Sequence, residues 1–382
     1  MNRIDSKTGA ALLERLNETA TANAEHAGIT EHAEVTGNAE HAEGHNDLWI
    51  TFGVFRVLSY FRVFRVLRVD LKEKRQLKIF NAADRLTLVY LIFSTTLIVV
   101  CQRKIPRWAT LLPIHLGLIL MISGLAYARE RSVLVLSLLS QWYPTLLFIF
   151  FFEEIGLIVH AIFPGWFDEY LIKADYAMFG AHPTVWIEQF SNYWLNEYMQ
   201  LVYTSYFLLT IGLGAYLWYR NRGGRNRGVH NRRVRDRGVR NRREDFAEFI
   251  ASTCAAYYLC YVIFVLFPVE SPYHTLRHLQ QVELAGGPFT AFINLIEKHG
   301  RVHGGAFPSA HVAGSMVALI SAWRFARRAG YWLTPLVLSV CVATVYGRYH
   351  YVSDVFAGIL VAVIGCWLGG KITSMKTERI EI

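Results

Sequence analysis

Cysteine is scarce in this sequence, with five residues among 382. All five fall within or at the ends of apolar runs: Cys101, Cys254, Cys260, Cys341 and Cys366. Their spacing matches no metal-binding motif and offers no disulfide framework. We therefore expect these side chains to serve as small apolar packing groups.

An apolar segment after the initial methionine is also lacking, so we expect no cleaved signal peptide. Residues 1–47 are polar instead, and Asn-Ala-Glu-His-Ala at Asn23 recurs at Asn38. Low complexity of this kind predicts a disordered tail. Its histidines could bind a metal, although a solvated tail is the simpler interpretation. They are His26, His32, His41 and His45.

Long apolar runs dominate the rest of the chain. Hydrophobic residues make up 53% of the sequence, and the mean hydropathy is +0.25. Soluble domains contain roughly 45–50% apolar residues, and a membrane helix needs roughly 20 in a row. We therefore predict an all-α, polytopic membrane bundle of about eight spans. The runs are Leu86–Cys101, Trp108–Tyr127, Tyr143–Phe163, Tyr198–Tyr219, Phe249–Phe267, Pro308–Trp323, Trp332–Gly347 and Val352–Gly370.

The net charge of +9 is concentrated in basic segments. Residues 48–82 interleave arginine with apolar residues, which favours a helix lying on anionic lipid. Residues 220–245 are dense in arginine but have no interleaved Phe, Tyr or Trp, on which single-stranded nucleic acid would stack. We interpret this loop as a cytoplasmic anchor and expect no nucleic-acid partner.

Loop charges predict the orientation of the spans. With the N-terminus in the cytoplasm, the inside loops 128–132, 220–245 and 324–331 all carry arginine, as the positive-inside rule requires. The long outside loop 164–197 has few cations, and the basic turn 102–107 is the one exception. We expect an integral protein of the plasma (inner) membrane. Its membrane domain covers residues 83–372, with a cytoplasmic tail at 373–382.

Two short motifs lie within residues 268–358. Pro-Ser-Ala-His ends at His311, and Arg-Tyr-His-Tyr-Val-Ser-Asp contains His350. The histidines are 350 − 311 = 39 residues apart, about the length of one helix down and one back. This spacing predicts that both histidines lie on the same face of the membrane, which the loop charges identify as the non-cytoplasmic face.

Each motif has residues suited to phosphoryl chemistry. Pro308 fits the first turn of a helix, whose N-terminus attracts anions. His350 and Asp354 are four apart and share one helix face, so the carboxylate can fix the imidazole tautomer for nucleophilic attack. His311 could protonate a leaving oxygen. Arg348 could hold phosphoryl oxygens.

These motifs resemble those of the type 2 phosphatidic acid phosphatase (lipid phosphate phosphatase) superfamily. Tyr-His-Tyr-x-x-Asp is closer to the branch that includes inositol phosphorylceramide synthases and sphingomyelin synthases. The resemblance implies a six-helix core, a phosphohistidine intermediate, a lipid phosphate substrate, and neither metal nor cofactor. It also implies that His350 is the nucleophile, Asp354 its orienting acid and His311 the leaving-group acid. Ser309 and Arg348 then resemble phosphate binders.

Two parts of the family pattern are absent. Its Lys-(six residues)-Arg-Pro motif is missing, and Ala343-Thr344 replaces its Ser-Arg pair. The phosphate would therefore need other cations, for which Arg348, Arg301 and Arg277 are candidates. Arg301 and His303 could lie behind the substrate contacts. The other polar residues that could line the mouth of the site are Glu270, His274 and Lys298.

The sequence leaves several functions open. We expect an integral membrane phosphoryl-transfer enzyme that hydrolyses a lipid phosphate ester. If a lipid hydroxyl replaces water as the acceptor, the enzyme is a phospholipid head-group transferase. A lipid-binding or transport protein that keeps the fold without the chemistry is a further alternative. A vanadate haloperoxidase is disfavoured because those enzymes are soluble. The oligomeric state does not follow from the sequence.

Overall fold

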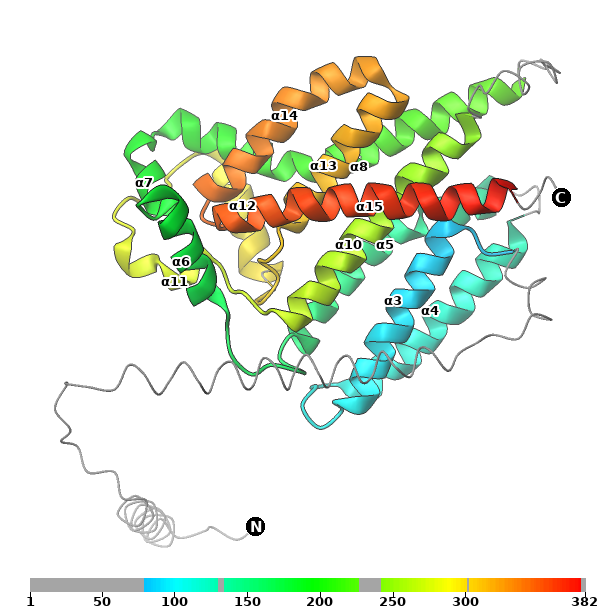
Figure 1. Ribbon diagram of the computed structural model, residues 1–382, viewed down its shortest axis with the longest axis horizontal. Coiled ribbons are helices and arrows are strands. Elements are labelled where there is room, and N and C mark those ends of the chain that lie inside the picture. Colours follow the sequence, from blue (N-terminus) through cyan, green and yellow to red (C-terminus); the bar gives the residue numbers. More distant parts are fainter. Residues whose placement is uncertain (1–78, 130–133, 227–241, 301, 379–382) are drawn as a thin grey trace, which may run out of the picture. The chain divides into compact units, whose positions relative to one another are not determined.

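The computed structural model describes residues 79–129, 134–226, 242–300 and 302–378 (Figure 1). Within these ranges the chain is helical, and its only β-type pairing is a single bridge between Val269 and Gly305. The tail at 1–47, nearly all of the basic segment at 48–82, Arg301, and residues 227–241 lie outside the described residues. The predictions made for them are therefore not addressed by the structure.

Seven of the described helices are long and apolar enough to cross a membrane. They are α3 (Ala82–Val100), α4 (Trp108–Ala128), α5 (Leu134–Ile158), α8 (Tyr193–Asn226), α10 (Arg242–Leu266), α14 (Arg327–Tyr346) and α15 (Val352–Glu378). The predicted all-α polytopic bundle is thus confirmed, and this is an integral membrane protein. The third span begins at Leu134 rather than Tyr143, because Pro144 is accommodated inside α5.

The eighth apolar run forms a helix that is shorter than the other spans. Helix α13 (Ala310–Phe325) has 16 residues, whereas a perpendicular crossing needs roughly 20. It packs against α14, α15 and α10, and much of its surface is buried, including Val312, Ala313 and Val317. Because neighbouring helices surround it, α13 does not need the length of a lipid-facing span.

The centre of the bundle is the contact between α10 and α15. Helix α10 is the most buried span, and small residues allow α15 to approach its backbone closely. A Cβ atom at Gly369 would lie 2.5 Å from the backbone nitrogen of Ser252, and one at Gly365 would lie 2.8 Å from the Cβ of Ala256. Glycines four apart on one face are typical of close helix packing in membranes.

Helices α3, α4 and α5 pack together and bury two clusters of ionisable residues. Asp84 accepts hydrogen bonds from Arg129 at 2.9 and 3.0 Å and from the Tyr143 hydroxyl at 2.9 Å. His115 lies 2.9 Å from Glu154, and both side chains are 1% exposed. Ionisable side chains within membrane helices are costly unless they have polar partners, and each of these residues has one.

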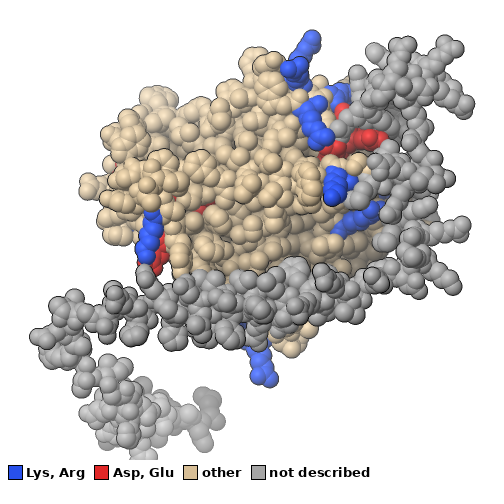
Figure 2. All heavy atoms as spheres, viewed as in Figure 1, with Lys and Arg blue, Asp and Glu red and all other residues tan. Residues whose placement is uncertain are grey.

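The two ends of the bundle differ in charge. At one end Arg220 pairs with Asp245 and also donates to the carbonyl of Phe325, while Arg324 pairs with Glu248. Figure 2 shows Lys and Arg side chains gathered at this end. Helix α13 terminates here and begins at the other end, close to His311. The histidine motifs and the Arg-rich end therefore lie at opposite ends of α13.

Short helices gather at the end where α13 begins (Figure 1). They are α6 (Asp168–Phe179), α7 (Pro183–Trp186), η2 (Ile187–Phe190), α11 (Pro272–Thr275), η3 (Arg277–Leu279) and α12 (Pro288–Gly300). They come from the two longest loops of this end of the bundle, and they surround the two histidine motifs.

Candidate active site

Two histidines and an aspartate form a chain of contacts where α13 begins. His350 Nε2 lies 3.3 Å from His311 Nδ1, and His350 Nδ1 lies 3.1 Å from Asp354 Oδ2. The same carboxylate oxygen accepts a bond from the backbone N–H of Tyr351 at 2.9 Å. The spacing of 39 residues predicted one face for the two histidines, and in the structure their ring nitrogens lie within contact distance.

The backbone around His350 is shaped by the end of α14. Arg348 adopts a left-handed conformation with φ of 65°, which is uncommon for a residue with a side chain. The turn lets the carbonyl of Thr344 accept bonds from the N–H groups of Tyr349 and His350, at 3.0 and 3.1 Å. The chain therefore reverses directly into α15, and His350 is held between two helix ends.

A serine and an aspartate join the two motifs through their backbones. Ser309 is the N-cap of α13, and its hydroxyl accepts a bond from the N–H of Val312 at 3.3 Å. Its own N–H donates to the carbonyl of Asp354 at 3.1 Å. The predicted phosphate binder Ser309 is thus fully buried, where it caps one helix and links it to the next.

Helix α6 supports the site with two aspartates that sequence reasoning did not select. Asp175 accepts bonds from the N–H groups of Val352 and Ser353 at 2.8 and 2.9 Å, so it caps the start of α15. Asp168 accepts from the Tyr351 hydroxyl at 2.9 Å, and burial raises its pKa. Residues seven apart lie on one helix face. Through these two aspartates, loop 164–197 supports the histidine motif.

Burial sets the protonation state of the candidate nucleophile. His350 is 3% exposed, and this burial lowers its pKa to about 4. Its imidazole is therefore neutral at physiological pH. A proton on Nδ1 satisfies the Asp354 carboxylate and leaves the lone pair of Nε2 directed at His311, as nucleophilic attack requires.

Aromatic rings of α8 hold His311. The Tyr203 ring stacks on the imidazole with centroids 4.6 Å apart, and the Tyr206 ring lies at 4.3 Å. Tyr203 also stacks on Tyr349 at 4.1 Å, next to His350 in the chain. The tyrosines are three apart in a predicted span, which indicates a shared helix face. Nothing in the sequence linked that face to His311.

Arg348 occupies a different position from the one predicted. Its guanidinium donates to Glu188 at 2.8 Å and to the carbonyl of Val282 at 2.5 Å, and the residue is 2% exposed. Burial lowers its pKa, and the Glu188 carboxylate acts in the opposite direction. Since Glu188 already neutralises this cation, Arg348 is less suited to bind phosphate than its place in the motif suggested. Arg301 lies outside the described residues.

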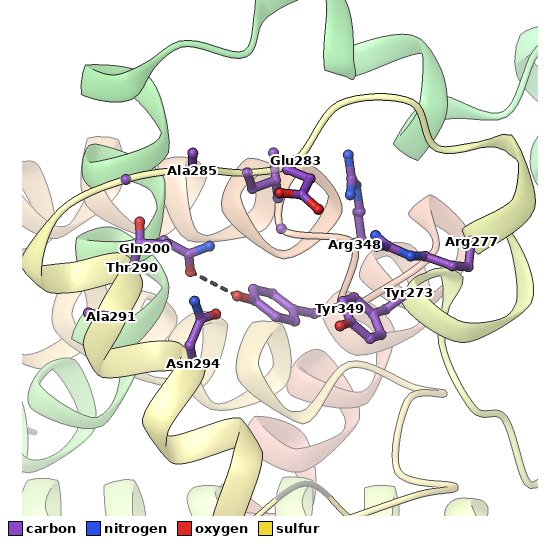
Figure 3. A pocket seen from close by; sticks show the side chains of 13 residues that line it. Gln200, Tyr273, Arg277, Glu283, Ala285, Thr290, Ala291, Asn294, Arg348 and Tyr349 are labelled. Carbon is purple, nitrogen blue, oxygen red and sulfur yellow. Dashed lines mark hydrogen bonds between the residues drawn. The ribbon is translucent and has the colours of Figure 1, made fainter.

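A polar pocket of about 400 Å³ adjoins the histidines through Tyr349. In Figure 3, Gln200 and Asn294 lie on one side of the Tyr349 ring, and Arg277 and Tyr273 lie on the other. The Tyr349 hydroxyl donates to Gln200 at 2.8 Å. Arg277 is exposed and is therefore the described candidate cation that remains accessible. The remaining lining residues are Glu283, Leu284, Ala285, Gly286, Thr290, Ala291, Gly347 and Arg348.

One wall of this pocket is the segment 280–290, which is held by acidic and amide side chains. Glu188 accepts bonds from the N–H groups of Gln281 and Val282 at 3.0 and 3.3 Å. Glu197 accepts from Thr290 N–H at 2.9 Å, at the start of α12. Because these partners are distant in the chain, the wall depends on how α8 and η2 pack.

Similarity to known proteins is found in the part of the chain that carries both histidine motifs. A model of the PAP2 superfamily matches residues 238–368. That range includes α10, α13, α14 and most of α15. Through this segment the chain is similar to the PAP2 superfamily. The closer resemblance to inositol phosphorylceramide synthases stays a prediction.

Over 138 residues, the chain is 28% identical to a PA-phosphatase related-family protein of Dictyostelium discoideum. The alignment covers 35% of this chain and a quarter of that relative's length. No solved structure matches the chain. The PAP2 segment does not contain the whole site, since Asp168, Asp175, Glu188 and Tyr203 all precede it.

Proposed function

We propose that this protein is a membrane phosphoryl-transfer enzyme that hydrolyses a lipid phosphate ester through a phosphohistidine on His350. One observation carries the proposal: a neutral, buried imidazole lies between a carboxylate and a second histidine at one end of a membrane bundle. The match of residues 238–368 to the PAP2 superfamily supports the same class of reaction.

In the first step, the Nε2 lone pair of His350 attacks phosphorus while the bond between phosphorus and the lipid oxygen breaks. His311, in its protonated form, donates a proton to the departing oxygen and becomes neutral. Positive charge develops on the His350 ring, and the Asp354 carboxylate stabilises it through the Nδ1–H bond. In the second step, neutral His311 removes a proton from water, which attacks phosphorus and releases phosphate from Nε2.

The resting geometry requires one ring to move. His350 Nε2 and His311 Nδ1 are 3.3 Å apart, so a phosphoryl group bonded to Nε2 would occupy space that His311 now fills. His311 must rotate when substrate enters. The stacked Tyr203 ring and the tilted Tyr206 ring border His311 and would limit that rotation to orientations beside the leaving oxygen.

Negative charge on the phosphoryl oxygens needs donors other than the missing family motifs. Helix α13 begins at Ala310, and the free N–H groups of a helix start favour an anion. Arg277 is exposed and lines the adjoining pocket. We assign these two features to phosphate binding, and we assign Arg348 to holding the pocket wall.

The polar pocket favours a second function, that of a head-group transferase. Amide and guanidinium groups of Gln200, Asn294 and Arg277 line it, and convergent polar groups in a pocket of this size suit a small polar molecule. In hydrolysis the pocket would hold the polar end of the substrate, which stays with phosphorus while the lipid alcohol departs. In transfer it would admit the donor's head group while a lipid hydroxyl replaces water.

We further propose that the site faces away from the cytoplasm. The paired Arg220 and Arg324 lie at the opposite end of the bundle, and arginine-rich ends favour the cytoplasmic side. Access from the outer leaflet then determines which lipids reach His350. Cysteine labelling of intact cells at positions beside Arg277 and beside Arg324 tests this orientation.

The activity test uses the full chain purified in detergent and labelled phosphatidate, polyprenyl pyrophosphate or phosphatidylinositol, each with and without ceramide. Release of free phosphate indicates a phosphatase, and a new phospholipid indicates a transferase. His350→Ala should abolish turnover, whereas His278→Ala, at an exposed loop position, should retain it. Turnover by the His350→Ala protein at the wild-type rate would refute the proposal. Lipid binding without turnover in the wild type would favour a non-catalytic protein.

A further inference from the structure

The two loops that lead into the candidate active site bring one glutamate and two histidines together. Glu270 and His274 follow α10, and His303 precedes α13. One ligand atom from each residue lies within 4.8 Å of the others. His303 Nδ1 is 2.9 Å from Glu270 Oε1, and the His274 and His303 ring centroids are 5.0 Å apart.

We propose that Glu270, His274 and His303 form a binding site for a divalent transition-metal cation of the zinc class. Two imidazoles and one carboxylate are a ligand set that zinc accepts, with water at the fourth position. Zinc bonds of about 2.0–2.2 Å at tetrahedral angles place ligand atoms roughly 3.4 Å apart. The His303 side chain is 52% exposed and that of Glu270 is 21% exposed, so they have room to adjust.

An ion pair between His303 and Glu270 accounts for two of the three residues. His274 lies on the separate helix α11, where its ring contacts those of Tyr273 and His303. A metal ion coordinates imidazole in its neutral form, and one ligand atom from each of the three side chains is close enough to share an ion.

The site would join the loop after α10 to the loop before α13. These loops already contact one another, because the N–H of Ala306 donates to the carbonyl of Val269 at 3.2 Å. The N–H of Glu270 donates to Asp168, which also accepts from the Tyr351 hydroxyl. The ion would therefore stabilise the loops beside His350 without touching the reacting atoms. It does not alter the expectation of metal-free phosphoryl transfer.

The test measures bound zinc, which does not depend on any enzyme activity. The full chain is purified with a tag that lacks histidine, and the four tail histidines are replaced by alanine, since they could bind metal themselves. After a chelator wash and dialysis against Zn²⁺, the bound metal is measured by elemental mass spectrometry. Co²⁺ titration then reports a four-coordinate site by its visible absorption.

We expect about one zinc ion per chain, a loss of most of it in His274→Ala and His303→Ala, and no loss in the matched control His278→Ala. Zinc should raise the unfolding temperature of the parent and the control only. Equal unfolding temperatures in chelator would show that the variants fold. Should His274→Ala fail to fold, Glu270→Gln and His303→Ala carry the test. Absence of zinc from the parent, or equal zinc in all variants, would overturn the proposal.

Discussion

Asp175 offers a direct test of how α6 supports the candidate site. Its carboxylate accepts the N–H groups of Val352 and Ser353 and also contacts the Ser353 hydroxyl, and the residue is 1% exposed. It therefore caps α15 from a different helix. Loss of an N-cap costs about 0.5–2 kcal/mol, and loss of a carboxylate at a helix start costs about 0.3–1 kcal/mol more.

Asp175→Ala should thus lower the free energy of unfolding by about 1–3 kcal/mol. Because α15 carries Asp354 in its first turn, the same change should misalign His350 and reduce kcat by roughly tenfold, which corresponds to about 1.4 kcal/mol. Asp175→Asn keeps one acceptor oxygen, so its stability and kcat should lie between those of the wild type and of Asp175→Ala. The assays are denaturant unfolding in detergent micelles and steady-state turnover of the preferred lipid.

The matched control is Glu169→Ala on the same helix. Glu169 pairs with Lys173, and both side chains are largely exposed, so its loss should change stability by less than about 0.5 kcal/mol. If Asp175→Ala and Glu169→Ala give the same unfolding curve and the same kcat, then capping by α6 does not position the histidine motif. The supporting role assigned to α6 would then be wrong.

The same geometry makes three further predictions. Burial lowers the pKa of His350 to about 4, so its neutral form persists in mild acid. Loss of kcat/KM through protonation of His350 should therefore appear near pH 4, and a loss in acid centred near the ordinary histidine pKa of about 6.5 would contradict it. Glu188→Gln leaves the Arg348 charge buried without its carboxylate and should destabilise the protein by about 3–5 kcal/mol in the same unfolding assay; an unchanged midpoint would show that Arg348 finds another anion. Tyr203→Leu removes the ring stacked on His311 and should cost about 0.5–1.5 kcal/mol of stability. It should lower kcat and leave KM nearly unchanged. A change in KM as large as that in kcat would indicate a role in lipid binding instead.

The PAP2 segment and the helices around it contribute different parts of the site. The segment contains His311, His350 and Asp354, which are the groups assigned to bond making and breaking. Helices α6 and α8 lie outside it and supply the aspartates and tyrosines that hold those groups. A chain shortened to residues 238–368 should therefore lack a properly positioned nucleophile, even though it retains both motifs.

Local sequence patterns were sufficient for several features of this protein. The lengths of apolar runs predicted the spans, because crossing a membrane imposes a minimum helix length. The 39-residue spacing brought His311 and His350 to one end of the bundle, because two helices return the chain to the same face. The four-residue spacing predicted that His350 and Asp354 share one helix face; they are in contact, but His350 precedes α15, and only Asp354 lies in its first turn.

Other features were decided only when the helices packed. Arg348 pairs with Glu188, 160 residues earlier in the chain, so its role could not be read from its motif. Asp175 and Tyr203 reach the site because α6 and α8 lie against the PAP2 segment, and no periodicity within either helix records which neighbour it meets. Local spacing is fixed by bond geometry, whereas these partners are set by the packing of whole helices, which a single sequence does not specify residue by residue.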